Sequence, residues 1–561
     1  MDDVARILAY HERTKHHAQR YARGPGWMDW STQPDPFRTF EGAPGLDLPL
    51  EMPLPATSYD DLHQPGAVTP IEPSLDSIST LFLLSLGLSA WKEFGGEGWA
   101  LRCNPSSGNL HPTEGYLVTP GLTGLPAGVH HYVSRDHRLE HRAALPPETA
   151  EALARALPPA AFLVGLTSIH WREAWKYGER AFRYCQHDVG HALAALRYAA
   201  ATLGWSAELV ESPGTAGLAA LLGVDRAADF PESSGPQREE ADALLLLRAR
   251  PASSDSIAAP AAAMPDALVE AGRLIASTAS WQGFANLLSP NHVDWEAIDV
   301  AAAASTRPAG PETPAPARSA AWPPLLPLAA FPAATLIRQR RSAVAMDGVT
   351  PLPAATFFGL LDRLLPRPGV PPWDVLAWAP HLHCALFVHR VEGLEPGLYF
   401  LERDPAAHDD LRRDLDRRFV WTRPAGSPEH LPLYLLAAGD QRGTASGVSC
   451  NQDLAGDGAF SLGMLAFFGE PIRARGAWWW RRLFWESGLL GQTLYLGAEA
   501  AGFRGCGLGC YFDDLVHQVL GLSGDRWQSL YHFAVGGPID DRRLATKPPY
   551  AHLAGRTPGG R

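Results

Sequence analysis

Three features are missing from this sequence, and each absence excludes a class of protein. Basic residues are not in excess: the formal net charge is −12 at pH 7, so nucleic acid is not an expected partner, because phosphate binding needs a basic face. The longest apolar runs, such as residues 81–88, are too short to span a bilayer, so no membrane is expected. The first residues carry acids and no apolar segment, which does not fit a secretory signal.

Paired cysteines are also missing. The six cysteines are scattered and form no CxxC pair, which is typical of reduced thiols in a cytoplasmic protein. A chain of 561 residues can bury a large apolar core in several domains without disulfides or a structural metal. Two histidine pairs have a four-residue spacing, His137 with His141 and His187 with His191. The first pair follows a strand pattern and the second lacks a third ligand, so no metal site is predicted.

Two Pro/Ala-rich stretches divide the chain, at residues 251–263 and 301–334, with a short helical pattern at 264–289 between them. Such composition is typical of a linker. We therefore predict a first domain at 1–250, a linker at 251–330 and a second domain at 331–561.

The segments on either side of the linker repeat one order of patterns. Thr69-Pro70 and Thr350-Pro351 each precede a helical pattern, with Thr expected as the N-cap. The further pairs are 124–133 with 393–402 (turn and strand), 162–168 with 431–439 (strands), 188–205 with 486–503 (buried helices ending at a glycine) and 242–250 with 530–537 (final strands). This order predicts an α+β fold that is duplicated, with the halves packed about a pseudo-twofold axis as in a homodimer.

The sharpest local signal is a small polar loop between two prolines. Its hydroxyl and amide groups can bond the edge of a planar heteroaromatic ring, and its glycine permits close backbone approach. The candidate residues are Pro105, Ser106, Ser107, Gly108 and Asn109. An ordinary Ser/Gly/Asn turn is the alternative interpretation.

Three motifs in order resemble the nitroreductase superfamily: this loop, Arg340-Arg341-Ser342, and residues 505–514. The resemblance is closest to the SagB/ThcOx-type branch, which includes azoline dehydrogenases of peptide natural-product biosynthesis, and it spans the chain apart from the linker. It implies a nitroreductase-like fold duplicated within one chain as an intramolecular pseudo-dimer. It also implies FMN held where the two domains meet.

The resemblance assigns cofactor-binding residues by position. Arg340 and Ser342 match the phosphate and ribityl contacts, for which a planar guanidinium is well shaped. Gly505, Gly507, Leu508 and Gly509 match a glycine turn against the flavin, and Pro105, Ser106, Ser107 and Asn109 match the loop from the partner domain. Arg543 or Lys547 could supply a terminal cation. Val344 stands where relatives keep a second basic residue, so that contact is missing.

The second copy of each motif is eroded. Residues 380–384 replace the Pro-Ser loop, 206–214 replace the glycine turn, and Glu12-Arg13-Thr14-Lys15 was the expected counterpart of Arg-x-Ser. Crossing the halves leaves one composite site with three intact parts and one with three damaged parts. We therefore expect one FMN per chain.

Lys176 and Tyr177 are the catalytic candidates, because the resemblance places a Lys-Tyr pair beside the flavin. A lysine near the flavin can take the proton that a dehydrogenated ring loses. Both side chains can face one substrate only if the helix breaks near Gly178. A surface charge cluster with Arg172, Glu173, Glu179 and Arg180 is the alternative.

Two aromatic segments have open roles. The tryptophan-rich run at 478–488 could line a pocket, although core and interface packing explains it as well. The irregular segment at 24–37 could be a lid or a surface wrap.

The sequence thus predicts an FMN-dependent oxidoreductase that dehydrogenates a heterocycle or peptide-linked ring, of the azoline-to-azole type. Its substrate would be a small molecule or a peptide. An NAD(P)H-dependent nitro or quinone reductase is the nearest alternative, and the lack of a GxGxxG motif decides little. A second alternative is a protein without enzymatic activity: a flavin-free scaffold partner in a peptide-modifying complex.

Overall fold

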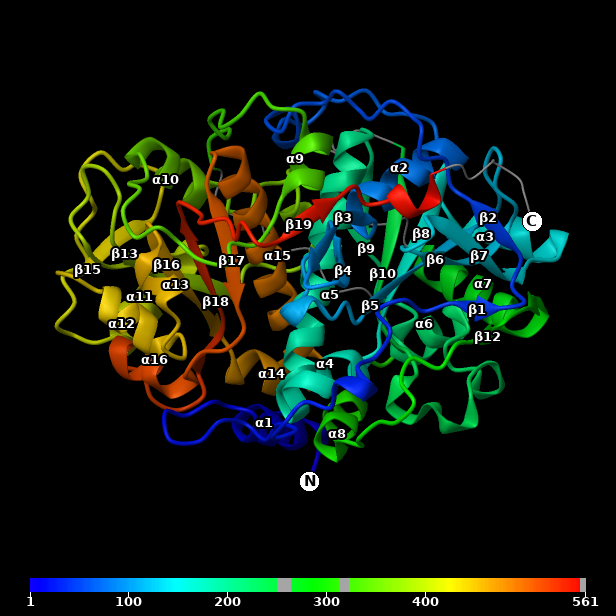
Figure 1. Ribbon diagram of the computed structural model, residues 1–561, viewed down its shortest axis with the longest axis horizontal. Coiled ribbons are helices and arrows are strands. Elements are labelled where there is room, and N and C mark those ends of the chain that lie inside the picture. The colour runs from blue at the N-terminus through cyan, green and yellow to red at the C-terminus, as the bar shows by residue number, and fades with distance from the viewer. Residues whose placement is uncertain (250–263, 312–321, 555–561) are drawn as a thin grey trace.

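The computed structural model describes residues 1–249, 264–311 and 322–554. Two antiparallel sheets lie side by side, with two long helices between them (Figure 1). No helix of this described part combines the length and the apolarity that crossing a bilayer would need.

The two sheets have the same strand order. In the first half the neighbours run β7 (Arg138–Ala144), β6 (Gly128–Val133), β5 (Thr113–Thr119), β8 (Ala161–Ser168), β10 (Glu240–Arg248) and β9 (Ser206–Leu209). In the second half they run β15 (Leu433–Ala438), β14 (Gly397–Leu401), β13 (Leu382–Val388), β16 (Phe460–Phe467), β18 (Trp527–Gly536) and β17 (Arg504–Leu508). The repeated order confirms the predicted α+β duplication.

This order corrects one predicted equivalence. Residues 162–168 and 431–439 both contain strands, but β8 has β16 as its counterpart, and β15 corresponds to β7. The expected pairing was wrong because the strand at 460–467 was not recognised. Its residues alternate between two cores, with Phe460 on the inner side and Leu465 on the outer side, as the period of two in a strand requires.

Helices α5 (Ala181–Thr202) and α15 (Trp479–Ala500) are the predicted buried helices. Both end in the same Schellman motif, in which the N–H of Trp205 bonds the carbonyl of Ala200 at 2.9 Å and that of Phe503 bonds Ala498 at 2.9 Å. The glycines before them, Gly204 and Gly502, have positive φ. The predicted glycine C-caps are therefore confirmed.

The predicted helix starts were misplaced. Helix α2 (Leu75–Ser85) begins after Ser74, which forms a capping box with Ser77, and α10 (Ala354–Asp362) begins after Pro353. Neither Thr69 nor Thr350 is a cap. Ser74 satisfies the first free N–H groups of α2 better, because its hydroxyl and that of Ser77 bond the backbone reciprocally.

Part of the predicted linker is ordered. Helix α7 (Met264–Thr278) buries Leu268 and Ile275 in the outer core of the first half, and α8 (Glu296–Ala304) packs beside α1 (Asp3–Arg13). Helix α9 (Ala333–Gln339) buries both of its alanines. The stretch at 251–263 lies outside the described residues, and the domain boundaries stay a prediction.

Further elements complete the two halves. Strand β1 (Phe40–Glu41) pairs with β12 (Phe284–Ala285), whereas β2 (Gly45–Asp47) and β11 (Ser280–Trp281) extend the first sheet beside β7. The remaining helices are α3 (Pro147–Ala156), α4 (His170–Tyr177), α6 (Gly214–Leu222), α11 (His408–Asp414), α12 (Arg442–Val448), α13 (Asp453–Asp457), α14 (Gly469–Arg475) and α16 (Asp513–Leu520).

The halves also exchange segments. Strand β19 (Ala545–Lys547), at the end of the second half, pairs with β3 (Leu88–Phe94), which pairs with β4 (Glu97–Arg102) of the first half. Figure 1 shows this red C-terminal strand crossing towards the blue strands. Such an exchange fits the predicted intramolecular pseudo-dimer.

A second crossing between the halves lies at Ser58 and Pro332, which form an antiparallel bridge. Helix α1 ends at Arg13 and packs against α8 and α14. The equivalence of residues 12–15 with Arg-x-Ser stays a prediction.

Candidate active site

The Pro-Ser loop of the first half is held in place by buried charges. Ser106 Oγ accepts a hydrogen bond from the N–H of His111 at 2.8 Å and donates to Glu173 Oε1 at 3.3 Å. The Ser107 N–H donates to Asp188 Oδ1 at 3.2 Å. The Asn109 amide is used within the half, where it bonds Ala100 O at 2.8 Å. Pro105 begins this loop and is buried.

Lys176 and Tyr177 both reach this loop. Helix α4 ends at Tyr177, because Gly178 has a φ of 55°. A Cβ atom built on Gly108 would lie 2.6 Å from Tyr177 Oη and 3.2 Å from Lys176 Nζ. The helix thus breaks where it must for both side chains to face one site, and both are half-buried.

Arg340 comes from the second half and points at the first. Its Nη2 donates to the Arg102 carbonyl at 3.3 Å, and its guanidinium lies 4.9 Å from the centroid of the Tyr495 ring. The residue is only 4 % exposed, yet Nε and Nη1 are buried without a hydrogen-bond partner among the described residues. An unpaired buried cation is costly, so this geometry fits an anion.

Ser342 is tied through Tyr495 to the predicted glycine turn at residues 505–509. The expected turn was wrong, because these residues form the edge strand β17 and the residue that follows it. Ser342 Oγ lies 2.9 Å from Tyr495 Oη, which accepts a hydrogen bond from the Gly507 N–H at 2.9 Å. The Ala343 N–H donates to Gly505 O at 2.9 Å. Arg340, Ser342 and the glycine turn therefore form one unit.

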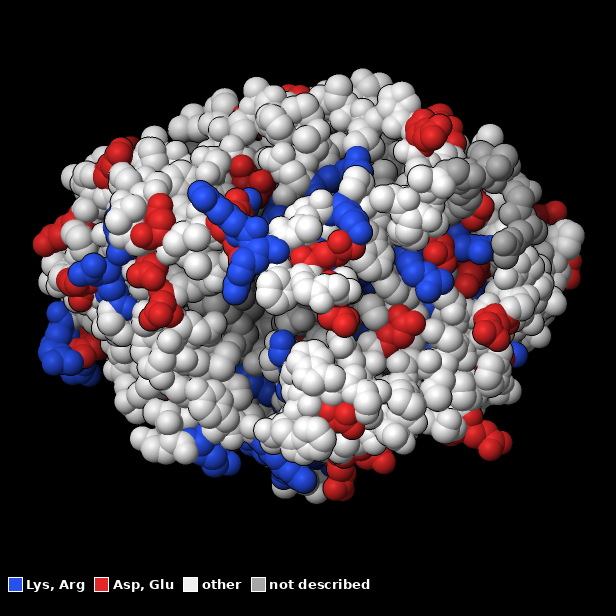
Figure 2. Space-filling model, viewed as in Figure 1, with Lys and Arg blue, Asp and Glu red and all other residues white. Residues whose placement is uncertain are grey.

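The glycine turn also meets the Lys-Tyr segment. Gly509 O accepts hydrogen bonds from Tyr184 Oη at 3.1 Å and Arg180 Nη2 at 3.2 Å. The Tyr184 ring is 4.6 Å from that of Tyr177, centroid to centroid. The structure therefore brings together the three motifs that sequence reasoning crossed between the halves. Figure 2 shows a hollow between the halves on this face, with basic side chains at its rim.

Three predicted residues lie elsewhere. Leu508 is buried in the outer core of the second half. Arg543 is exposed and pairs with Asp541 at 2.7 Å, and Lys547 pairs with Glu93 on β3. No contact of the described residues joins either cation to Arg340.

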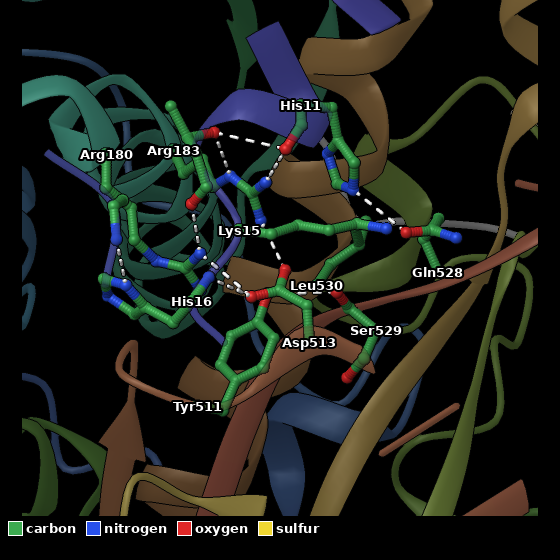
Figure 3. Close-up of polar contacts among 12 residues, drawn as sticks. His11, Lys15, His16, Arg180, Arg183, Tyr511, Asp513, Gln528, Ser529 and Leu530 are labelled. Carbon is green, nitrogen blue, oxygen red and sulfur yellow. Dashed lines mark hydrogen bonds and ion pairs between the residues drawn. The ribbon is translucent and has the colours of Figure 1, made fainter. Parts of the chain in front are cut away.

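Beneath the glycine turn lies a buried charge cluster that fixes the N-terminal segment (Figure 3). Asp513 accepts hydrogen bonds from Arg180 at 3.1 Å, from Arg183 at 2.8 Å and from the His16 N–H at 3.0 Å. The two guanidinium groups hold the pKa of the Asp513 carboxyl well below its usual range against the opposing effect of burial. The cluster ties α1, α5 and α16 together under the site.

The alternative that Lys176 belongs to a surface charge cluster was wrong. Arg172, Glu173, Glu179 and Arg180 are all buried. Arg172 donates to the His111 carbonyl at 2.8 Å and so anchors the end of the Pro-Ser loop. Charges that resemble a solvated helix face in the sequence are in fact the interior support of the site.

Sequence reasoning missed a buried carboxyl pair, Glu173 and Asp188. The two groups lie within hydrogen-bonding reach of each other and below Ser106 and Ser107. Burial is the main cause that raises the pKa of Asp188 to about 7 and that of Glu173 well above its ordinary value. The signal was present, since Glu173 stands one helical turn before Lys176, but the neighbouring arginines concealed it.

The tryptophan-rich run packs in the hydrophobic core. Trp479, Trp480 and Trp485 are fully buried, and Trp480 stacks on Phe182 with ring centroids 5.3 Å apart. The segment at 24–37 covers α4, where Trp175 Nε1 donates to Asp29 O at 3.1 Å.

The histidine pairs serve interior contacts. His187 bonds the Leu530 carbonyl at 2.9 Å, and His191 bonds Tyr531 Oη at 3.2 Å. Glu12, His17 and Asp514 do converge at the surface within the described part of the chain. Lys15 already pairs with both acids there, at 2.8 and 3.1 Å.

The counterpart of the composite site is filled by an ion pair. Aligning Gly190 with Gly488 places Arg197 where α15 has Tyr495. Arg197 pairs with Asp374 at 2.8 Å and donates to the Trp205 carbonyl at 3.1 Å. Among the described residues, Arg197 thus has partners for its charge at this counterpart position, unlike Arg340.

Comparison with known proteins gives a family match, a curated relative and two solved structures. Residues 428–537 match the model of the Nitroreductase family. A trifolitoxin-processing protein of Rhizobium leguminosarum bv. trifolii, TfxB, is 32 % identical over 181 residues, covering 29 % of this chain and 47 % of that protein. The chain thus spans about half the length of this curated relative.

Among solved structures, a candidate nitroreductase from Anabaena variabilis superposes with a TM-score of 0.65 at 22 % identity, over 96 % of this chain and 100 % of that chain. The microcin synthetase McbBCD complex from E. coli matches 36 % of this chain and 70 % of that chain, with a TM-score of 0.26 and 17 % identity. The Anabaena structure shares both halves of the fold. Residues 428–537 are thus similar to the Nitroreductase family, and the whole chain has the duplicated nitroreductase-like fold.

Proposed function

We propose that the chain is an FMN-dependent oxidoreductase with one composite site. The observation that carries the proposal is the buried guanidinium of Arg340, whose Nε and Nη1 have no hydrogen-bond partner among the described residues where the halves meet. A phosphate group neutralises the charge and its oxygens accept hydrogen bonds from such donors, which is the contact that arginine commonly makes with phosphate.

The residues around Arg340 fit the rest of the cofactor. Ser342 offers a hydroxyl for the ribityl chain. The missing side chains of Gly505, Gly507 and Gly509 make room for the aromatic rings of Phe533, Tyr531 and Tyr184. Ser106, Ser107 and Gly108 close the site from the first half. When bound, FMN supplies hydride acceptance and donation, which no side chain of this chain can perform.

For the reaction, we propose dehydrogenation of a heterocycle, with an azoline ring in a peptide as the favoured substrate. Such a ring loses one hydrogen as a hydride and one as a proton. Lys176, half-buried and beside Gly108, takes the proton, and Tyr177 orients the ring by hydrogen bonding. The trifolitoxin-processing relative supports a peptide substrate.

Two alternatives predict different behaviour. An NAD(P)H-dependent nitro or quinone reductase would not need Lys176 as a base. A flavin-free scaffold in a peptide-modifying complex would bind no FMN, and the unpaired donors of Arg340 argue against it.

The test has two stages. Purified protein is examined for the visible absorbance of FMN, with identification of the flavin released by heat. The loaded protein is then mixed with an azoline-containing peptide, and the loss of two hydrogens is followed by mass spectrometry. Protein that stays colourless after incubation with excess FMN would overturn the proposal, and flavin-loaded protein that reduces quinones with NADPH but leaves azolines unchanged would favour the reductase.

A further inference from the structure

We propose that Glu173 and Asp188 share one proton at neutral pH and together set the protonation of Lys176. They are positioning residues, acting on substrate only through the lysine. The catalytic consequence rests on the proposed function, whereas the sharing of the proton does not.

The first support is geometric. Glu173 lies on α4, one turn before Lys176, and Asp188 lies on α5, so the bend at Gly178 brings the two carboxyl groups together. Both side chains are almost fully buried. Glu173 Oε2 and Asp188 Oδ2 have no donor among the described residues. Two ionised carboxylates cannot donate to each other, whereas one proton between them provides a hydrogen bond and removes one negative charge.

The second support is an internal comparison. Asp188 and Glu486 occupy equivalent positions, two residues before Gly190 and Gly488. Asp188 accepts the Ser107 N–H and Glu486 accepts the His381 N–H, each from the loop before the equivalent strand. Glu486 is paired with the buried Arg403, so its charge is neutralised. A buried carboxylate whose charge is neutralised by an arginine is therefore enough to anchor the loop in the second half. The half with the intact Pro-Ser loop has a second carboxyl group instead.

The charges around the pair define its effect. The titratable groups that interact with it are Lys176 and Tyr177 of α4, Cys185 of α5 and Tyr531 of β18. Lys176 is the cation among them. With one shared proton, the pair keeps one negative charge, which balances the ammonium that forms when Lys176 accepts a proton. With two charges it would hold the lysine protonated more strongly, and with none it would leave the ammonium unpaired.

The sharing of the proton has a signature in stability. Because burial raises the pKa of Asp188 to about 7, the folded protein keeps a proton that the unfolded chain releases near pH 4. The stabilisation that the bound proton gives the folded protein is therefore full below about pH 4 and is lost as pH rises through about 7. Asp188→Asn and Glu173→Gln should both remove that loss.

The experiment compares the melting temperature of these variants with that of the wild type from about pH 5 to about pH 8, in protein freed of flavin. Relative to the wild type, each variant should gain about 2 °C in melting temperature across this range. Glu486→Gln is the matched control, which should lower stability by a similar amount at each pH. A variant-minus-wild-type difference that is flat with pH would overturn the proposal.

A second readout observes the lysine directly. The sequence has four lysines, Lys15, Lys92, Lys176 and Lys547, so their ¹³C-methylated amines can be assigned by substitution and titrated by NMR. In the double variant Glu173→Gln/Asp188→Asn the titration midpoint of Lys176 should move to lower pH, because a neighbouring negative charge that favours the ammonium is removed, with the other three unmoved. An unmoved Lys176 would overturn the coupling. Both readouts can succeed in a protein that never binds flavin, so failure of the proposed function is distinguishable.

Discussion

Gly190 and Gly488 face each other where helices α5 and α15 cross, and a Cβ atom built on Gly190 would lie 2.8 Å from the Cα atom of Gly488. The reverse substitution would bring a Cβ atom on Gly488 to 2.7 Å from the Cα atom of Gly190. This reciprocity places the pseudo-twofold axis at the two glycines. The composite site depends on the crossing, since Asp188 and Tyr495 lie on these helices.

Gly190→Ala should therefore destabilise the protein by about 1–3 kcal/mol. The new Cβ atom would meet Trp485 O and Gly488 Cα, which are backbone atoms and cannot turn away as a side chain can. Gly443→Ala in α12 is the control. A Cβ atom there meets nothing within 4 Å, and alanine favours a helix by up to about 1 kcal/mol. Denaturant unfolding measures both. An unaffected Gly190→Ala would mean that the helices lie further apart than described.

The flavin content should be one FMN per chain. Within the described part of the chain, Arg340 of one composite site has unpaired nitrogens, whereas Arg197 at the counterpart position is paired with Asp374. Flavin released by heat, measured against protein concentration, gives the ratio. A value near two would show that the filled counterpart opens to bind a second cofactor.

Arg340→Ala should weaken FMN binding by roughly ten- to a hundred-fold, since it removes a charge-assisted contact worth about 1.5–3 kcal/mol. Arg418→Ala is a matched loss of charge, because Arg418 is exposed and pairs only with its neighbour Asp416. Flavin titration by fluorescence measures both. Equal affinity in the two variants would place the phosphate elsewhere and direct attention to Arg543 and Lys547.

Much of the fold could be predicted because its signals are local. Short segments of the sequence contain the glycines that end α5 and α15, and the same order of such segments occurs twice. The starts of α2 and α10 were misjudged because a local Thr-Pro pattern was taken as the helix start. Thr-Pro is a common cap, but Ser74 and Ser77 satisfy the backbone together, and Ser-x-x-Ser is a weaker pattern in sequence than the usual capping box.

The motifs of the site could be predicted from the sequence, but the buried charged residues that hold these motifs in place could not. Crossing the halves brought Arg340 beside Arg102, just before the loop at Ser106, because each motif has its own residue pattern. The pairing of Glu173 with Asp188 depends on the bend at Gly178, which brings two helices together. No sequence pattern shows that Arg172 and Arg180 are buried, since their partners Asp35, His111 and Asp513 lie far from them in the sequence.

Lys176→Ala should separate the dehydrogenase from a general reductase. Removing a protein base that takes a substrate proton should lower azoline dehydrogenation by about 10²- to 10⁴-fold. The bound FMN should stay, because Lys176 is held by α4 of the first half whereas the phosphate contact comes from Arg340. NADPH-driven reduction of a simple quinone should stay nearly unchanged, since a good hydride acceptor needs no dedicated base.

Both activities are measured in the same flavin-loaded preparation of Lys176→Ala, so a loss of folding would lower both and be recognised. Tyr177→Phe gives a graded comparison, because it keeps the ring that contacts Tyr184 and removes only the hydroxyl near Gly108. We expect a smaller loss from it than from Lys176→Ala, since orienting a ring contributes less than accepting its proton. Equal losses of azoline dehydrogenation and quinone reduction, with full FMN content, would end the assignment of Lys176 as the base. The FMN assignment would stand, because it rests on Arg340 and the glycine turn.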